Sequence, residues 1–233
     1  IKFTILRSEI LEFLANLVAQ IVQTIYHVLS GLGIPSYGLA IVVMTIIIKI
    51  LLFPLTKKQI ESTRAMMAIQ PKMKEIQEKY KYDKVRLNEE LAKLYKEQNV
   101  NPMAGCLPLL VQMPILFGIY YAIRDFHYEG PANFLWMNNI ANPDSMYILP
   151  VLSAVTTYIQ AKQTMPKKAP GDKEQGGLMG MMQGQMMLYF MPLFIGYISL
   201  TFPAGLVIYW IVMNIMQIAQ QAYLNNQAEK AGR

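Results

Sequence analysis

The sequence predicts an all-α, polytopic membrane protein with five transmembrane helices, an N-terminal amphipathic interfacial helix and a cytoplasmic helical hairpin. Three observations predict this fold class. Hydrophobic residues make up 54% of the 233 residues and charged residues only 15%, whereas typical globular chains carry about 25% charged residues. The apolar residues fall in long blocks, with a mean hydropathy of +0.27. The loops between these blocks are alternately rich and poor in lysine and arginine.

The N-terminal segment, 1–35, is expected to lie outside the cytoplasm and to form the amphipathic helix. Apolar side chains recur at helical spacing from Leu11 to Ile25, while glutamate, glutamine and histidine side chains interrupt the run. A sixth span is the alternative for this segment. Because the chain begins at Ile1 and not at Met, any signal peptide or lipidated segment is expected to have been removed, and the sequence does not tell whether one existed.

Five apolar stretches are long enough to cross the hydrocarbon layer, which is about 30 Å thick and requires about 20 helical residues. The expected spans are residues 36–56, 102–124, 146–164, 185–200 and 204–224. They are joined by the helical hairpin at 57–101, an extracytoplasmic loop at 125–145 and a cytoplasmic loop at 165–184, and a cytoplasmic tail follows at 225–233. Lysine and arginine gather in the first loop, the third loop and the tail, so the positive-inside rule places the N-terminus outside and the C-terminus inside.

The segment 57–101 is too polar to span a membrane and too long for a simple connector. One apolar stripe runs from Ile60 to Ile76 and a second from Val85 to Tyr95, which predicts two antiparallel helices with a turn near residue 80. Pro71 is expected to kink the first helix. The hairpin is interpreted as a basic arm that meets incoming chains or delivery factors; a solvated surface hairpin without a task is the alternative. Interleaved acidic residues and the lack of an aromatic stacking pattern speak against nucleic-acid binding.

Lys49 is the only full charge deep within an apolar run. A lysine at the centre of a bilayer costs about 2.5–3.5 kcal/mol, so its surroundings need an explanation. Its long side chain could snorkel toward the membrane surface. The sharper hypothesis is a water-filled cavity, because polar residues in lipid must find partners and each of the other spans offers one. The polar residues considered for this cavity are Thr45, Gln112, Gln160, Asn214 and Gln217.

Several function classes lack their sequence signals. We find no phosphate-binding Gly-x-x-x-x-Gly-Lys-Ser/Thr loop, no carboxylate relay within the spans, and no His or Lys base near Ser153 or Ser199. The single cysteine, Cys106, and the two distant histidines do not have metal-ligand spacing. The sequence therefore predicts a non-enzyme with no catalytic residue, no bound metal and no cofactor.

Several sequence segments together resemble the YidC-type membrane protein insertases, the bacterial relatives of the mitochondrial oxidase-assembly and chloroplast albino insertases. The strongest match is residues 101–115 (NPMAGCLPLLVQMPI). The further matches follow in family order along nearly the whole chain: 53–56 (FPLT), 70–72 (QPK), 147–150 (YILP) and 202–210 (FPAGLVIYW).

The resemblance implies a hydrophilic groove open to cytoplasm and lipid but closed on the outer side. Lys49 occupies the position of the family's groove charge, which is usually arginine; lysine keeps the charge but lacks the planar fork. Thr45 and Trp210 match family positions that matter for activity, although an aromatic residue in a span is also often a packing anchor. The expected groove and client-binding residues are Lys49, Thr45, Gln112, Gln160, Trp210, Asn214 and Gln217.

The resemblance also implies a function: insertion and folding of inner-membrane proteins in the bacterial cytoplasmic membrane. The expected clients are nascent membrane proteins with short acidic translocated tails, attracted by the groove charge. The Sec translocon, the ribosome, the signal-recognition-particle receptor and membrane lipids are candidate partners. A small-solute transporter or channel and a purely structural membrane scaffold are the rival classes.

Overall fold

The computed structural model describes residues 2–101, 107–124, 128–165 and 186–231. Nearly all of these residues are helical, and an isolated bridge between Phe134 and Met137 is the only β-type pairing among them. The all-α prediction is thereby confirmed for the described part of the chain. The expected cytoplasmic loop at 165–184 lies outside it, apart from residue 165.

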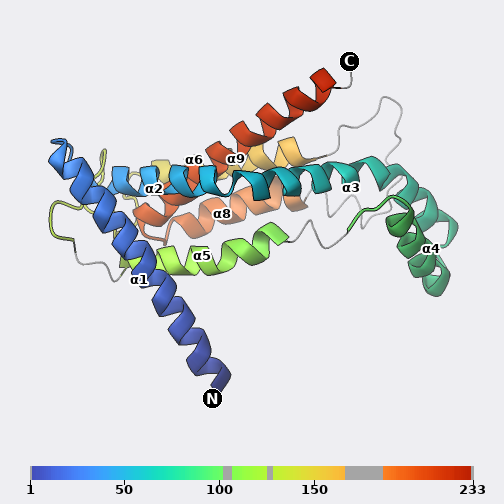
Figure 1. Ribbon diagram of the computed structural model, residues 1–233, viewed down its shortest axis with the longest axis horizontal. Coiled ribbons are helices and arrows are strands. Elements are labelled where there is room, and N and C mark those ends of the chain that lie inside the picture. Colours follow the sequence, from blue (N-terminus) through green and yellow to red (C-terminus); the bar gives the residue numbers. More distant parts are fainter. Residues whose placement is uncertain (1, 102–106, 125–127, 166–185, 232–233) are drawn as a thin grey trace.

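Figure 1 shows the helices, with an extended loop between α5 and α6 at one end of the molecule. In chain order the helices are α1 (Lys2–Gly31), α2 (Tyr37–Leu51), α3 (Phe53–Lys79), α4 (Lys84–Glu97), α5 (Leu107–Arg124), α6 (Ile148–Thr164), the π-helical turn η2 (Met186–Phe190), α8 (Met191–Ser199) and α9 (Ala204–Ala231).

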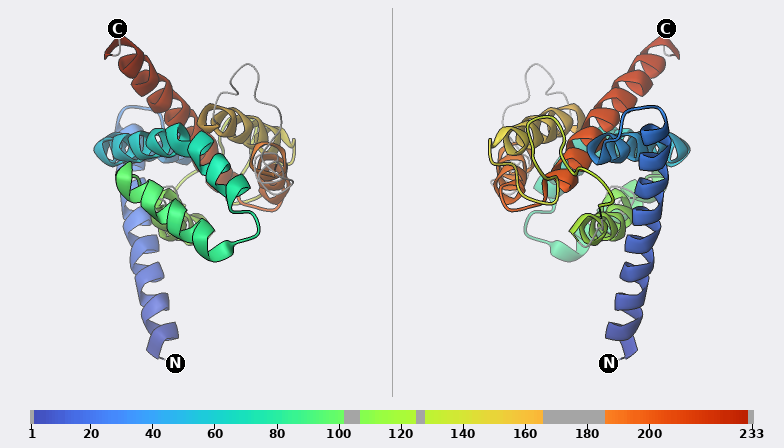
Figure 2. Two further views of the ribbon diagram at one scale, coloured as in Figure 1. Left: turned by 90° about the vertical axis from the view of Figure 1, so that its right-hand side faces the viewer. Right: turned by 90° about the vertical axis from the view of Figure 1, so that its left-hand side faces the viewer.

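Helix α9 holds two groups of helices together. It packs against α2 on one side and α6 on the other, while α1 packs against α2 and α5, and α6 packs against α8. Figure 2 shows α1, α2 and α5 on one side and α6 with α8 on the other. We call the end where α2 begins, beside the loop 128–147, the loop end, and the opposite end, where α2 meets α3, the hairpin end.

The main apolar core lies at the loop end. The first turns of α2 and α9 and the last turns of α5 are buried there, together with one face of α1. Gly38 lets α2 approach the loop, because a Cβ at this position would overlap the ring of Phe134. The buried residues that form this core include Val22, Tyr37, Ile41, Ile119, Ile123, Ile140, Leu206 and Val207.

Helix α2 is shorter than the span expected at 36–56. Ser36 caps its start, since the Ser36 Oγ accepts a hydrogen bond from the Leu39 nitrogen at 3.2 Å. The helix ends at Leu51, and the chain bends by 65° into α3. Pro54 lies in the first turn of α3 and has no N–H to donate to the carbonyl of Ile50, which favours a break at this point.

The hairpin segment forms α3 and α4, which pack around a small core of their own. Ile69, Leu94 and Val100 are its buried members, separate from the main core. Asp83 starts α4 by accepting a hydrogen bond from the Arg86 nitrogen at 3.0 Å. Helix α3 continues through Pro71, with no break at that residue.

Helix α1 bears on the number of spans. Its segment Glu12–Gly31 is the one single helix among the described residues that is long and apolar enough to cross a membrane, and α2 with α3 would count as a second if the bent pair were one span. By length and composition alone, α1 is compatible with both the interfacial placement and the sixth span. The interfacial placement and the count of five spans stay predictions.

One further boundary differs from the sequence-based one. Helix α9 continues to Ala231, through the region expected to be a tail from residue 225. Polar residues that end the apolar span do not end the helix, because glutamine, glutamate and lysine favour helical backbone as well.

Helices α6 and α8 expose large apolar side chains, an arrangement that suits contact with lipid. The most exposed of them are Val151, Val155, Leu193 and Tyr197.

Candidate functional site

The candidate site is built around the ammonium group of Lys49, in the last turn of α2. The side chain is half-buried, and its Nζ donates a hydrogen bond to Oε1 of Gln217 on α9 at 2.8 Å. Gln220, about one turn further along α9, donates from Nε2 to the main-chain carbonyl of Lys49 at 3.1 Å. Carbonyls at a helix end lack helical partners, so the Gln220 amide supplies one. Two glutamines of α9 thus hold both the side chain and the backbone of Lys49.

Asn214 fastens α9 to α6 one turn before Gln217. Its side chain is almost fully buried, and its Nδ2 donates to the hydroxyl oxygens of Thr156 and Thr157 at 3.3 Å and 3.0 Å. Hydrogen bonds of this kind between membrane helices contribute about 0.6–2 kcal/mol each. Asn214 therefore sets the position of α9 between α2 and α6.

The other expected site residues do not bond to Lys49. Thr45 is buried, but its hydroxyl donates to the carbonyl of Ile41 in its own helix at 2.7 Å. Gln112 on α5 donates from Nε2 to the Tyr209 hydroxyl of α9 at 2.8 Å. Gln160 is half-buried on α6, and no hydrogen bond of its side chain is described. Of the seven expected residues, the structure joins only Gln217 to Lys49 by a side-chain bond.

Trp210 lies one turn before Asn214 in α9. Its indole N–H is buried, and no acceptor for it exists among the residues that the structure describes. A buried polar group without a partner costs about 1–3 kcal/mol. The carbonyl oxygens of the Gln163 and Gln220 side chains are also buried without a hydrogen-bond donor among the described residues.

The sequence interpretation missed several residues that complete these contacts. Gln220, Thr156, Thr157 and Tyr209 supply partners for Lys49, Asn214 and Gln112. Spacing could have found Gln220, because it follows Asn214 and Gln217 at three-residue intervals in α9. The two threonines and the tyrosine had no comparable signal.

Burial along α2 changes at the site. Tyr37, Ile41 and Met44 are fully buried toward the loop end, whereas Ile47, Ile50 and Leu51 are exposed toward the hairpin end. Lys49 therefore lies outside the tightly packed core. No ion pair of Lys49 is found within the described ranges, so its charge has no acidic partner there.

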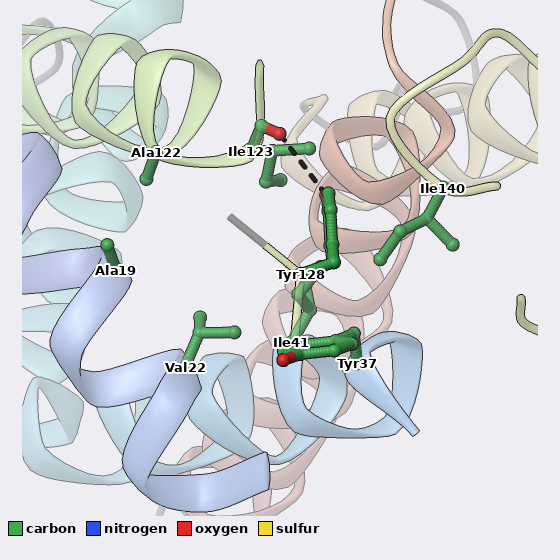
Figure 3. Close-up of a pocket in the computed structure, with 8 residues that line it drawn as sticks. All are labelled: Ala19, Val22, Tyr37, Ile41, Ala122, Ile123, Tyr128 and Ile140. Atoms are coloured by element: carbon green, nitrogen blue, oxygen red, sulfur yellow. Dashed lines mark hydrogen bonds between the residues drawn. The ribbon is translucent and has the colours of Figure 1, made fainter. Parts of the chain in front are cut away.

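A small cavity among the described residues lies at the loop end, away from Lys49. Its volume is about 10 Å³, enough for about one water molecule, and Figure 3 shows residues of α1, α2, α5 and the loop around it. Tyr128 at its edge donates from its hydroxyl to the Ile123 carbonyl at 3.2 Å, and burial, with the nearby Tyr37, raises the pKa of Tyr128 to about 12. Ile41 in the cavity wall lies about 12 Å from Lys49 along the helix axis.

The chain matches a known family over most of its length. The sequence profile of the family described as 60Kd inner membrane protein matches residues 28–231. A protein of Clostridium perfringens named membrane protein insertase YidC is 38% identical over 227 residues, which cover 93% of this chain and 92% of the relative. Membrane protein insertase YidC 1 of Listeria monocytogenes is 44% identical over 195 residues, covering 82% of this chain and 64% of that protein.

The similarity extends to longer proteins and to a solved structure. YidC of Syntrophus aciditrophicus is 43% identical over 197 residues, and the match covers only 34% of its length. The chain thus spans between a third and two thirds of several curated relatives. The crystal structure described as an active YidC insertase with the first transmembrane domain resolved superposes with a TM-score of 0.61 at 26% identity, covering 88% of this chain and 44% of that one.

Proposed function

This chain belongs to the 60Kd inner membrane protein family of YidC-type insertases, and from that premise we propose that it inserts membrane proteins into the bacterial cytoplasmic membrane and assists their folding. We further propose that Lys49 attracts the acidic tail of a client chain within a hydrated groove. The observation that supports this most directly is the half-buried ammonium of Lys49, which bonds to a neutral amide and pairs with no acid in the described ranges. An unneutralised cation at this depth is suited to drawing in a carboxylate.

The proposed mechanism lowers the cost of moving a short polar segment across the bilayer. Each unsatisfied backbone group of a peptide in hydrocarbon costs several kcal/mol. A groove hydrated from the hairpin end would remove much of this cost and shorten the remaining barrier. The decrease in packing from Thr45 toward Leu51 is consistent with such an opening. Once the tail has entered, burial of about 20 apolar client residues in lipid drives insertion without a nucleotide.

The topology belongs to the same proposal. The hairpin end faces the cytoplasm and the loop 128–147 faces outward, because the basic segments lie at the hairpin end. The client path is lined by Lys49 and Gln217 together with Gln112, Gln160 and Trp210. Thr45 supports α2 beside Lys49. The hairpin of α3 and α4 meets clients and delivery factors, of which the Sec translocon, the ribosome and the signal-recognition-particle receptor are the candidates.

Reconstitution into liposomes that contain no other protein tests this proposal. The client is a short single-span protein with an acidic N-terminal tail, and its protection from added protease measures insertion. We expect the wild type and Lys49→Arg to insert it, and Lys49→Ala and Lys49→Glu to insert much less. Lys57→Ala is the matched control, since Lys57 is exposed and pairs only weakly with Glu61 at 3.9 Å.

The same liposomes separate the rival classes. A solute transporter would release a trapped solute without inserting the client, and a scaffold would do neither. Equal insertion by wild type and Lys49→Ala at matched protein levels would reject the charge-attraction step. Failure of the wild type to insert any client would reject the proposed activity.

A further inference from the structure

Gln217 occupies the place where a client carboxylate is proposed to bind. Its amide oxygen lies 2.8 Å from the Lys49 Nζ, a typical hydrogen-bond distance. It is the only side-chain acceptor that the ammonium has among the described residues. A client must therefore displace Gln217 or share the ammonium with it.

The neighbours of Gln217 hold it in position. Asn214, three residues before it, is bonded to two threonines of α6, and Gln220, three residues after it, is bonded to the Lys49 carbonyl. These bonds fix the backbone of α9 on both sides of Gln217. The amide consequently faces the ammonium without the cost of ordering a flexible helix.

The chemistry of the exchange decides which clients gain by displacing Gln217. A peptide carbonyl is an amide oxygen like that of Gln217, so a neutral tail exchanges one neutral acceptor for another. A carboxylate adds its charge, and charge-assisted hydrogen bonds are about twice as strong as neutral ones. Only an acidic tail therefore gains from the exchange.

We propose that Gln217 is a specificity-determining residue, a built-in competitor that restricts capture at Lys49 to carboxylate-bearing tails. This inference rests on the proposed function and adds a physical reason why client tails without a carboxylate bind poorly at Lys49. Selection against the wrong partner by a competing contact is a common route to specificity. Without Gln217, the ammonium would donate a hydrogen bond to a backbone carbonyl of any tail.

Two substitutions at Gln217 are each expected to weaken the preference for acidic clients, one through insertion of the neutral client and the other through insertion of the acidic client. Gln217→Leu removes the competitor. At a client concentration that already saturates capture of the acidic tail, only insertion of the client with a neutral tail can rise, so the acidic-over-neutral ratio is expected to fall by up to about fivefold, the difference between a charge-assisted and a neutral hydrogen bond. Gln217→Glu supplies a permanent carboxylate, so insertion of the acidic client is expected to fall. Gln227→Leu, the same change on an exposed residue of α9 that bonds only to Tyr223, is the control.

The measurement is the ratio of protected acidic client to protected neutral client, two versions of one protein that differ only in the tail charges. Thermal unfolding in detergent is recorded for each variant to show that it folds. If Gln217→Leu does not fold, the test rests on Gln217→Glu, because an ion pair between the new carboxylate and Lys49 replaces the lost hydrogen bond. An unchanged ratio in the folded Gln217 variants, with a lowered ratio in Lys49→Ala, would overturn the role of Gln217 and leave the proposed function standing. An unchanged ratio in Lys49→Ala would instead reject the proposed charge attraction at Lys49, and failure of the wild type to insert either client would reject the proposed function itself.

Discussion

The carboxylate of Asp144 accepts a hydrogen bond from the main-chain nitrogen of Leu149 at 2.8 Å, so a loop residue caps the first turn of α6. The same carboxylate accepts bonds from the Trp136 indole at 2.9 Å and the Met146 nitrogen at 3.0 Å. Asp144 is 3% exposed. A single buried charge thus ties the loop 128–147 to the start of a helix that carries part of the site.

This capping predicts acid sensitivity. Burial alone would raise the pKa of Asp144, but the hydrogen bonds from Leu149, Trp136 and Met146 outweigh it, so the pKa lies below its ordinary value. A group with a lowered folded pKa stabilises the fold above its unfolded pKa, which is about 3.9 for aspartate, and this contribution is lost as pH falls through the folded value. We expect the melting temperature to decline below about pH 4.

Asp144→Asn is expected to lower the melting temperature at neutral pH and to weaken its acid dependence. The amide keeps one acceptor oxygen but presents an N–H₂ to a buried donor, a cost of about 1–3 kcal/mol. Glu129→Gln is the control, since Glu129 is a largely exposed loop acid. Trp136 fluorescence in a Trp210→Phe background reports on the loop itself. An unchanged acid dependence in Asp144→Asn would contradict this role.

Gly38 and Phe134 predict a paired substitution effect. A methyl group at Gly38 overlaps the Phe134 ring, so Gly38→Ala is expected to destabilise the protein by about 1–3 kcal/mol through overpacking. Phe134→Ala in the same chain should recover part of this loss, which a double-mutant cycle on thermal unfolding measures. Gly31→Ala is the control, because no atom lies within 4 Å of its added methyl group. Strictly additive effects would show that the two residues do not contact.

Trp210 allows its ring and its N–H to be tested separately. Trp210→Phe removes the buried indole N–H that lacks an acceptor among the described residues, so the melting temperature is expected to stay equal or to rise slightly. Insertion in liposomes should be retained, because an apolar ring remains in the client path. Trp210→Ala is expected to reduce insertion. A large loss of insertion in Trp210→Phe would show that the N–H itself contacts clients.

The separate core of the hairpin predicts local unfolding. Leu94 is buried between α3 and α4, and replacing a buried leucine by alanine costs about 2–5 kcal/mol in a full core and less at a small cluster. Leu94→Ala should speed hydrogen exchange in α3 and α4 while the amides of α6 and α9 stay protected. Glu89→Ala, at an exposed position of α4, is the control. Equal acceleration throughout the bundle would show that the two cores unfold together.

Much of the architecture could be predicted from the sequence, because apolar blocks and charge runs are local signals. Hydropathy located the regions of α2, α5, α6 and α9, and the two apolar stripes located the regions of α3 and α4. The break after Leu51 was missed because the apolar run continues past it to Leu55. Pro54 was the available signal for that break.

The site could be predicted only in part. Lys49 and Gln217 were both singled out because a polar side chain in an apolar helix requires a partner, and the structure pairs them. Their partnership spans 168 positions of sequence, which no local pattern reveals. The capping role of Asp144 has no sequence signal, since its bonds form between residues whose spacing is not helical.

The first amide groups of α9 donate to the loop carbonyls of Asn142 and Ile140 at 2.8 Å and 2.9 Å, and this joint has an electrical consequence. A protein that admits water from one face of an energised membrane must keep the opposite face dry, or protons would leak and dissipate the gradient. In the proposed topology this is the outer face, and there the loop carbonyls bond the first two amide groups of α9, which are therefore not free to hold a chain of water molecules. Current recordings across a planar bilayer should therefore stay silent until this joint is loosened.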